Sequence, residues 1–223
     1  FTVMNDVLYL TAGDSESGGE LWRTDGTEAG TFRVKDIVSG GNGSLPDPSV
    51  NANGTLYFTA YAGASRQLWR SDGTDEGTIQ LTDVLLATGV YPTIRNITCV
   101  GSDVFFVMYE STGYALWKSD GTADGTKGVK SLPSSDYGPV NLTAWKGDLF
   151  FSLEGRFRGA KLKLWRSDGT EAGTAEAMPS ANDAAIAVGD VYPIAVINDE
   201  LLIVADTVHY GIELWTSKVA PSN

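Results

Sequence analysis

The sequence predicts an all-β protein, a five-bladed β-propeller of four-stranded antiparallel blades. Two observations carry this prediction. Tryptophans recur at separations of 47, 48, 48 and 50 residues, at Trp22, Trp69, Trp117, Trp165 and Trp215. Each lies in a unit of short strand-like segments divided by Gly, Asn and Asp, and no segment has the apolar period of a helix. Four short strands in every ~40–50 residues are typical of propeller blades.

One unit contains four predicted strands in order. The first is ITCV at 97–100 or LTAW at 142–145, followed by a tight polar turn. The second is VFFVM at 104–108 or LFFSL at 149–153, and a variable loop leads from it to the third, which holds the Leu-Trp pair. An Asp-Gly-Thr turn then leads to a fourth, outer strand. The second strand is apolar at successive positions, which indicates burial on both faces between neighbouring blades.

The repeats fill the chain as a single predicted domain, with units at about 1–46, 47–94, 95–139, 140–191 and 192–223. The last unit lacks the Asp-Gly-Thr turn and its own outer strand, which leaves an open edge at Glu213–Ser217. Three explanations stay open: a three-stranded last blade, a strand from sequence outside this chain, or a strand from another molecule.

Composition narrows the function classes. The chain has 223 residues and a net charge of −12, so binding to nucleic acid or to anionic membranes is disfavoured. No run of eighteen apolar residues occurs, and we expect no membrane insertion. Cys99 is alone in a strand-like segment, where we expect a buried structural thiol. The chain begins at Phe1 within a strand pattern, as expected for a mature or excised piece of a longer protein.

The recurring motif reads Leu-Trp-(Arg/Lys)-(Ser/Thr)-Asp-Gly-Thr-x-x-Gly-Thr, in four near-complete copies from Leu21, Leu68, Leu116 and Leu164. A leading Glu is present at Glu20 and Glu213. These residues resemble the ELWxxDGT repeat family of bacterial secreted and surface proteins, and the likeness covers essentially the whole chain. The resemblance implies an extracellular or cell-surface protein and supplies no catalytic residues. The Asp-Gly-Thr hairpin more distantly resembles the repeats of TolB-type β-propellers.

The motif is interpreted first as a structural turn between two strands. In this interpretation the Asp carboxylate accepts backbone hydrogen bonds and Gly takes a positive φ. The turn residues are Asp25, Gly26, Asp72, Gly73, Asp120, Gly121, Asp168 and Gly169. The second glycine of each copy (Gly30, Gly77, Gly125 and Gly173) is expected to supply a bulge or another unusual backbone conformation. The five tryptophans are expected to fill the blade interfaces, and the basic residue after each Trp is expected to form an exposed ion pair with the motif Asp.

The sequence offers two chemical alternatives to a purely structural motif. Calcium is one, because repeated Asp side chains at 25, 72, 120 and 168 offer oxygen ligands, although each loop supplies only one Asp at a fixed place. Catalysis is the other. His209 is the only histidine, and phosphate loops, zinc motifs and a nucleophile elbow are absent from the sequence. We therefore expect no enzyme activity and no cofactor, and keep a polysaccharide hydrolase or lyase as the alternative.

The loops between the second and third strands vary most and are candidates for ligand contact. Their aromatic residues are Tyr61, Tyr109, Tyr114, Phe157 and Tyr210. Possible glycosylation sequons stand at Asn42, Asn53, Asn96 and Asn141. The sequence thus predicts a non-catalytic extracellular or cell-surface module for interaction, adhesion, or filament or surface-layer assembly. Its partner would be a protein or a glycan, self-association could use the edge near Trp215, and a lectin-like role is the alternative.

Overall fold

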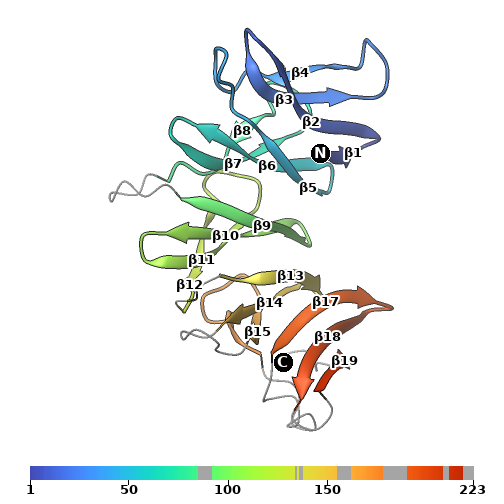
Figure 1. Cartoon of the computed structure of the whole chain (residues 1–223), viewed down its shortest axis with the longest axis vertical. Helices are drawn as coiled ribbons and strands as arrows, with labels where there is room; N and C mark the ends of the chain where they lie inside the picture. The colour runs from blue at the N-terminus through green and yellow to red at the C-terminus, as the bar shows by residue number, and fades with distance from the viewer. Residues whose placement is uncertain are drawn as a thin grey trace. The chain divides into compact units, whose positions relative to one another are not determined.

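The computed structural model describes residues 1–84, 92–133, 135, 138–154, 162–177, 190–207 and 211–217. The prediction of an all-β chain is confirmed, since these residues form antiparallel strands and no helix. Each sheet is a meander in chain order (Figure 1). Among the described residues no helix is long and apolar enough to cross a membrane.

Four sheets have four strands and the fifth has three described strands. The first contains β1 (Thr2–Met4), β2 (Val7–Asp14), β3 (Gly18–Thr24) and β4 (Phe32–Lys35). The second contains β5 (Asp47–Ala52), β6 (Thr55–Ala62), β7 (Ser65–Ser71) and β8 (Ile79–Gln80). The third contains β9 (Thr93–Val100), β10 (Asp103–Glu110), β11 (Gly113–Ser119) and β12 (Lys127–Ser131). The fourth contains β13 (Val140–Trp145), β14 (Asp148–Glu154), β15 (Leu162–Ser167) and β16 (Ala175–Glu176). The fifth contains β17 (Val191–Ile197), β18 (Glu200–Thr207) and β19 (Gly211–Ser217).

The chain divides into two compact units, each described here by itself. One consists of Phe1–Thr112 and Trp117–Lys127, and the other of Gly113–Leu116 with the described residues from Gly128 onward. The first unit holds the first two sheets and most of β9–β11, and the second holds the fourth and fifth sheets.

Successive sheets pack face to face within each unit. In the first unit, Met4, Tyr9, Leu21 and Val34 of the first sheet form one apolar cluster with Leu56, Phe58, Ala60 and Trp69 of the second. The opposite face of the second sheet contributes Ala52, Tyr57, Leu68 and Leu81 to a cluster with Ile94, Val104, Phe106 and Met108. In the second unit, Trp145, Phe150 and Leu164 pack against Val191, Leu201, Ile203 and Ala205. Burial on both faces explains the continuous apolar runs of β6 and β10.

The turn between the first two strands of a sheet is tight in most repeats. Two successive residues take positive φ at Asn5-Asp6, Asn53-Gly54, Lys146-Gly147 and Asn198-Asp199. This pair of left-handed residues is the signature of the type I′ hairpin, whose twist matches that of the flanking strands. The polar turns of the sequence therefore set the hairpin register.

Candidate functional site

The four Asp-Gly-Thr turns connect β3 to β4, β7 to β8, β11 to β12 and β15 to β16, and they share one hydrogen-bond pattern. In the second sheet, Asp72 Oδ1 accepts the backbone N–H of Thr74 at 2.9 Å and its hydroxyl at 2.7 Å. The same two bonds, at 2.8–2.9 Å and 2.7 Å, join Asp25 to Thr27, Asp120 to Thr122 and Asp168 to Thr170. The carboxylate is thus engaged within its own turn.

These bonds change the acidity of the turn aspartates. The threonine hydroxyl bond, followed by the threonine N–H bond, lowers the pKa of Asp72 below its ordinary value. The same causes in the same order lower the pKa of Asp25, Asp120 and Asp168. Hydrogen bonds to the ionised form favour that form, so the four carboxylates are charged over a wider pH range than a free aspartate.

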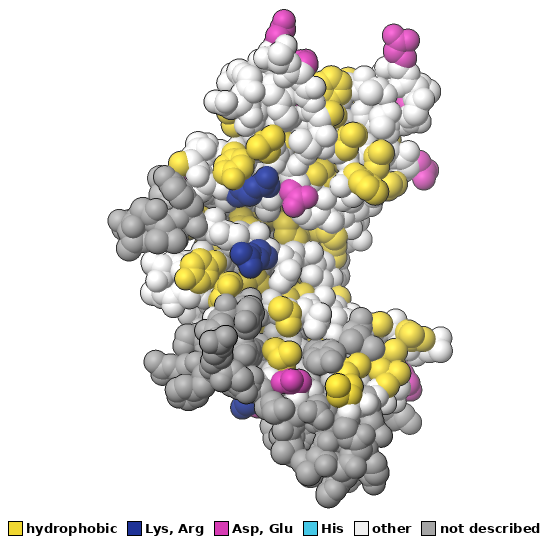
Figure 2. Space-filling view, viewed as in Figure 1, with side chains coloured by type: hydrophobic (Ala, Val, Ile, Leu, Met, Phe, Trp, Pro, Cys, Tyr) yellow, Lys and Arg dark blue, Asp and Glu magenta, His cyan; other side chains and the backbone are white. Residues whose placement is uncertain are grey.

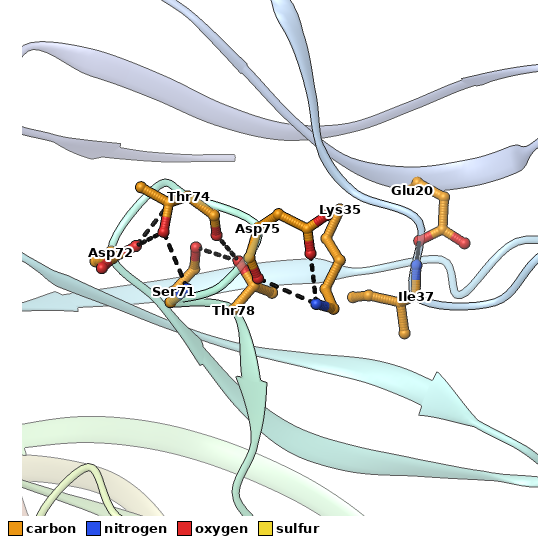
Figure 3. Close-up of polar contacts among 9 residues, drawn as sticks. Glu20, Lys35, Ile37, Ser71, Asp72, Thr74, Asp75 and Thr78 are labelled. Carbon is orange, nitrogen blue, oxygen red and sulfur yellow. Dashed lines mark hydrogen bonds and ion pairs between the residues drawn. The ribbon is translucent and has the colours of Figure 1, made fainter.

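The remaining hydroxyls of the turn are also engaged. Thr74 Oγ1 accepts the N–H of Gly77 at 3.0 Å, and Thr78 Oγ1 donates to the Thr74 carbonyl at 2.6 Å. Ser71 Oγ accepts the N–H of Gly73 and lies 2.7 Å from Thr78 Oγ1. Figure 3 shows this network around Asp72. The motif residues therefore satisfy one another, which is the pattern of a structural turn.

The structure gives the second glycine a reason that differs from a positive φ. The first glycines have φ of +86° to +94°, but Gly30, Gly77, Gly125 and Gly173 have no positive φ. A Cβ on any of these four would instead overlap the carboxylate of its own turn aspartate. The second glycine is required because the carboxylate occupies the space of a side chain.

Two of the turns also contact the preceding sheet. A Cβ on Gly73 would overlap the Tyr9 hydroxyl of β2, and one on Gly121 would lie 2.7 Å from the Tyr57 hydroxyl of β6. Burial raises the pKa of both tyrosines. The first glycine therefore serves the turn conformation and the close approach of one sheet to the next.

A lysine of the outer strand of one sheet bonds to the Asp-Gly-Thr turn of the next sheet. Lys35 Nζ lies 2.6 Å from Asp75 Oδ1 and 3.0 Å from the Asp75 carbonyl (Figure 3). At the equivalent position in the third sheet, Lys130 donates to the carbonyls of Glu171 and Thr174 at 3.1 Å and 2.7 Å. The turns are thus joints between successive sheets, held by packing on one side and by lysine on the other.

The predicted ion pair with the motif Asp was wrong for Lys118 and Arg166, which pair with another aspartate. Lys118 pairs with Asp103 at 3.3 Å and Arg166 with Asp148 at 2.7 Å, across to the start of the preceding strand. Arg23 lies over the ring of Phe32 at 5.1 Å. Arg166 is paired with Phe150 in the register, so it reaches Asp148 diagonally across the two strands. Asp25, Asp120 and Asp168 instead accept bonds from their own turn threonines.

The structure places four of the five repeated tryptophans. Trp69 lies in the cluster between the first and second sheets, and Trp117 packs against the cluster between the second and third. Trp165 stacks on Phe151 with ring centroids 6.1 Å apart, and Trp22 is half-buried. The backbone of Trp215 pairs with Ile203, but its side chain lies outside the described residues.

In the first two repeats, the residue before the Leu-Trp pair has a role that sequence reasoning missed. The Glu20 side chain is fully buried and accepts the N–H groups of Ile37, Val38 and Ser44 at 3.2, 3.0 and 2.9 Å, together with the Ser44 hydroxyl. Gln67, at the same position, accepts the Thr82 hydroxyl and the Val84 N–H. Both fix the connection to the next sheet. The sequence signal for this role is a polar residue directly before an apolar Leu-Trp pair.

Two of the four sequons have a structural explanation. Asn96 and Asn141 have φ of +56° and +55°, each at a register shift of the first strand of its sheet. Asparagine tolerates this left-handed conformation, and the threonine two residues on donates to the asparagine carbonyl. Asn53 begins a hairpin turn and donates to the Gly101 carbonyl, and Asn42 is exposed. The Asn-x-Thr pattern at 96 and 141 is therefore also the chemistry of a β-bulge.

The structure describes three of the five aromatic residues that the sequence predicts as ligand contacts. Tyr61 and Tyr109 stand at the same position of β6 and β10, with 36% and 41% of their surface exposed. Arg66 lies over the Tyr61 ring at 4.9 Å. Tyr114 packs against Gly138, where a Cβ would lie 2.7 Å from its ring. Phe157 and Tyr210 lie outside the described residues, as does His209.

Within the described residues, no three His, Cys, Asp or Glu side chains converge in a group that could hold a metal. The turn aspartates belong to four separate turns. Cys99 is half-buried, its Sγ lies 3.5 Å from the Asn51 carbonyl, and burial raises the pKa of the thiol.

Comparisons with known proteins bear on the fold alone. No family model matches the chain, and no curated protein matches it. The chain is similar to a puromycin hydrolase structure, with a TM-score of 0.51 and 13% identity over 93% of this chain and 33% of that one. A prolyl endopeptidase structure gives a TM-score of 0.49 and 12% identity over 97% of this chain and 34% of that one. A chain of a nidogen/laminin complex gives 0.44 and 13%, over 94% and 73%.

This chain spans about a third of the length of the first two similar chains. The described residues accordingly form an all-β protein of antiparallel sheets, four of them four-stranded.

Proposed function

We propose that this chain is a non-catalytic interaction module, a five-bladed propeller that acts outside the cell or at its surface. Its role is adhesion, or the assembly of a filament or surface layer, through contact with a protein or glycan. The resemblance to ELWxxDGT repeats supports the location. The use of the motif's polar groups within the turns supports a scaffold over a repeated ligand site.

The observation that carries the proposal is that the carboxylate and hydroxyls of the motif hydrogen-bond within their own turn. Large apolar side chains are also exposed in both units. Val3 of β1 has 57% of its surface exposed and Leu214 of β19 has 60%. Figure 2 shows apolar side chains gathered over β1 and over the β17–β18 hairpin on the face in view. Exposed apolar surface of this kind marks protein contact sites.

A lectin-like role is the second candidate, favoured by the repeated exposed tyrosine of Tyr61 and Tyr109. Aromatic rings with a neighbouring polar side chain suit contact with a sugar face, and Arg66 supplies that neighbour for Tyr61. A polysaccharide hydrolase or lyase remains the enzyme alternative. It would need two carboxyl groups about 5–10 Å apart in one pocket.

One experiment separates the three candidates. Soluble chain is passed over immobilised chain and over a panel of cell-surface polysaccharides, and the same polysaccharides are assayed for new reducing ends. We expect binding without new reducing ends. Release of reducing ends above a heat-denatured control would contradict the non-catalytic proposal. Absence of binding to every surface would contradict the interaction proposal.

Loss of polysaccharide binding in Tyr61→Ala and Tyr109→Ala would favour the lectin-like role. Phe32→Ala is the matched control, because Phe32 is an aromatic residue 42% exposed on β4, outside these loops.

A further inference from the structure

The first unit contains two Asn-Gly pairs, Asn42-Gly43 and Asn53-Gly54, which the structure holds in different ways. In an Asn-Gly pair the backbone nitrogen of the glycine can attack the side-chain amide of the asparagine and close a five-membered ring. Glycine favours this reaction because it has no side chain to hinder the ring. The hydrogen bonds around each pair therefore decide whether the reaction can occur in the folded chain.

Asn53-Gly54 is held at both reacting groups. The side-chain amide of Asn53 donates to the Gly101 carbonyl at 3.2 Å. The Gly54 N–H donates to Asn51 Oδ1 at 3.0 Å. The pair forms the tight turn between β5 and β6, where both residues have positive φ. Attack of the Gly54 nitrogen on the Asn53 amide carbon would therefore break two hydrogen bonds and disturb the turn.

Asn42-Gly43 lies in the connection from β4 to β5, and its asparagine side chain is not held in this way. Asn42 is exposed, and within the described part of the chain its side chain makes no hydrogen bond. Residues 39–42 are all exposed and include Gly40 and Gly41. The Gly43 N–H donates to the Gly40 carbonyl at 3.2 Å, inside this exposed segment. Local opening of one backbone bond thus frees both reacting groups.

The Asp-Gly pairs that open the recurring turns could close the same ring, and the motif restrains them as well. The Gly73 N–H donates to Ser71 Oγ at 3.0 Å, and Asp72 Oδ1 accepts two bonds from Thr74. In the other three turns the first glycine also donates its N–H to the Ser or Thr hydroxyl before the aspartate. An ionised carboxylate is a poor target for a nitrogen nucleophile, and these bonds favour the ionised form.

We propose that Asn42 is a site of spontaneous deamidation in the folded chain and that Asn53 is protected from the same reaction. The Gly43 nitrogen gives its proton to water and bonds to Cγ of Asn42, the Cγ–Nδ2 bond breaks, and the amide leaves as ammonia. Water then opens the succinimide ring, at Cγ to give aspartate or at the main-chain carbonyl carbon to give isoaspartate. The net reaction consumes one water and releases one ammonia. It needs no partner and is independent of the proposed interaction role.

The products would alter the connection that Glu20 holds. Ser44, two residues after Asn42, donates its N–H and its hydroxyl to the buried Glu20 carboxylate. Gly43 lies so close to Gly19 that a Cβ on Gly43 would overlap the Gly19 backbone. Isoaspartate lengthens the main chain by one methylene group directly before these contacts, and both products add negative charge. The deamidated chain is therefore expected to unfold at a lower urea concentration than the fresh chain.

Peptide mapping by mass spectrometry measures both sites in one sample. The folded chain is incubated in mildly alkaline buffer, which favours loss of the glycine amide proton, and aspartate and isoaspartate at positions 42 and 53 are quantified over time. We expect Asn42 to react about tenfold faster than Asn53 or more, because Asn53 must lose an additional side-chain hydrogen bond and its turn. The same incubation in urea is the control, and it should remove the difference, since both sites are then unfolded Asn-Gly pairs.

Two variants locate the cause of the difference. Asn51→Ala removes the acceptor of the Gly54 N–H and should raise the rate at Asn53 without changing the rate at Asn42. Ser49→Ala, at another exposed polar residue of β5, is the matched control and should change neither rate. Asn42→Gln, whose longer side chain closes a ring far more slowly, should keep its urea midpoint on incubation.

Equal rates at Asn42 and Asn53 in the folded chain would overturn the proposal. A folded chain that stays unmodified at Asn42 while the urea-unfolded chain reacts there would overturn it as well.

Discussion

Within one Asp-Gly-Thr-x-x-Gly-Thr turn, the aspartate carboxylate is held between the threonine that follows and the second glycine. The threonine supplies two hydrogen bonds, and the glycine leaves the space that the carboxylate fills. The invariant spacing of the motif follows from these two contacts. A substitution of the threonine or of the second glycine should therefore disturb the aspartate that contacts both.

Gly77→Ala is expected to destabilise the chain by about 1–2 kcal/mol, since its methyl group would displace the Asp72 carboxylate from Thr74. In the double variant with Asp72→Ala, the carboxylate that the methyl group would displace is absent, so the two effects should not add. Chemical unfolding of the wild type, both single variants and the double variant measures this coupling. Additive destabilisation would show that the carboxylate and glycine do not share the space.

Acid should weaken the turns. The pKa of the four turn aspartates is lower in the folded chain than the value of about 3.9 expected when unfolded. A lowered folded pKa stabilises the chain above the unfolded pKa, and this stabilisation is lost as the pH falls through about 4 toward the folded value.

The four aspartates should therefore leave the melting temperature, Tm, unchanged between about pH 5 and 7, which lies above the unfolded pKa of about 4. Below about pH 4 the Tm should decrease as the pH falls. A variant with all four aspartates changed to Asn should have a lower Tm at pH 7 and a shallower fall in acid. Equal acid dependence in the two proteins would contradict the role of the turn carboxylates.

At the scale of the element, connections between sheets depend on the residue before the Leu-Trp pair. Glu20 accepts hydrogen bonds from the backbone N–H groups of residues 37, 38 and 44, and Gln67 accepts one from the N–H of Val84. The third repeat has Ala115 and the fourth has Lys163, which pairs with Glu176 at 2.8 Å. Of these four residues, only Glu20 and Gln67 therefore hold the connection that leads to the next sheet.

Glu20→Ala is expected to cost about 2–4 kcal/mol, because three backbone N–H groups and the Ser44 hydroxyl lose a buried acceptor. Glu20→Gln should cost less, because an amide oxygen still accepts, as it does at Gln67. Urea unfolding of both variants checks the order. Equal losses for Ala and Gln would contradict an acceptor role for this side chain.

The strands and turns of a repeat were predictable because their signals are local. The apolar runs of β6 and β10 indicated burial on both faces, and Asp-Gly indicated a turn. The reason for Gly77 and the partner of Arg166 were not predictable, since both depend on how two chain segments approach in space. The sequon at Asn96 was visible, but only the φ of +56° explains the asparagine.

At the scale of the whole molecule, one contact repeats between successive sheets within each of the two units. The face of one sheet that carries the leucine of the Leu-Trp pair packs on the face of the next sheet that carries tryptophan or its apolar neighbours. The Asp-Gly-Thr turn of the next sheet lies at the edge of this contact. Removal of one turn is therefore expected to loosen two sheets.

Thermal unfolding of the wild type and of Asp72→Ala, each in calcium and in chelator, tests most directly whether the recurring motif is a joint of the fold. We predict that Asp72→Ala lowers Tm by the same amount in both solutions, because Thr74 loses its acceptor with or without the ion. We also predict equal Tm for the wild type in both. A Tm of the wild type raised by calcium, with the increase reduced in Asp72→Ala, would contradict the joint and identify the turn as a calcium ligand.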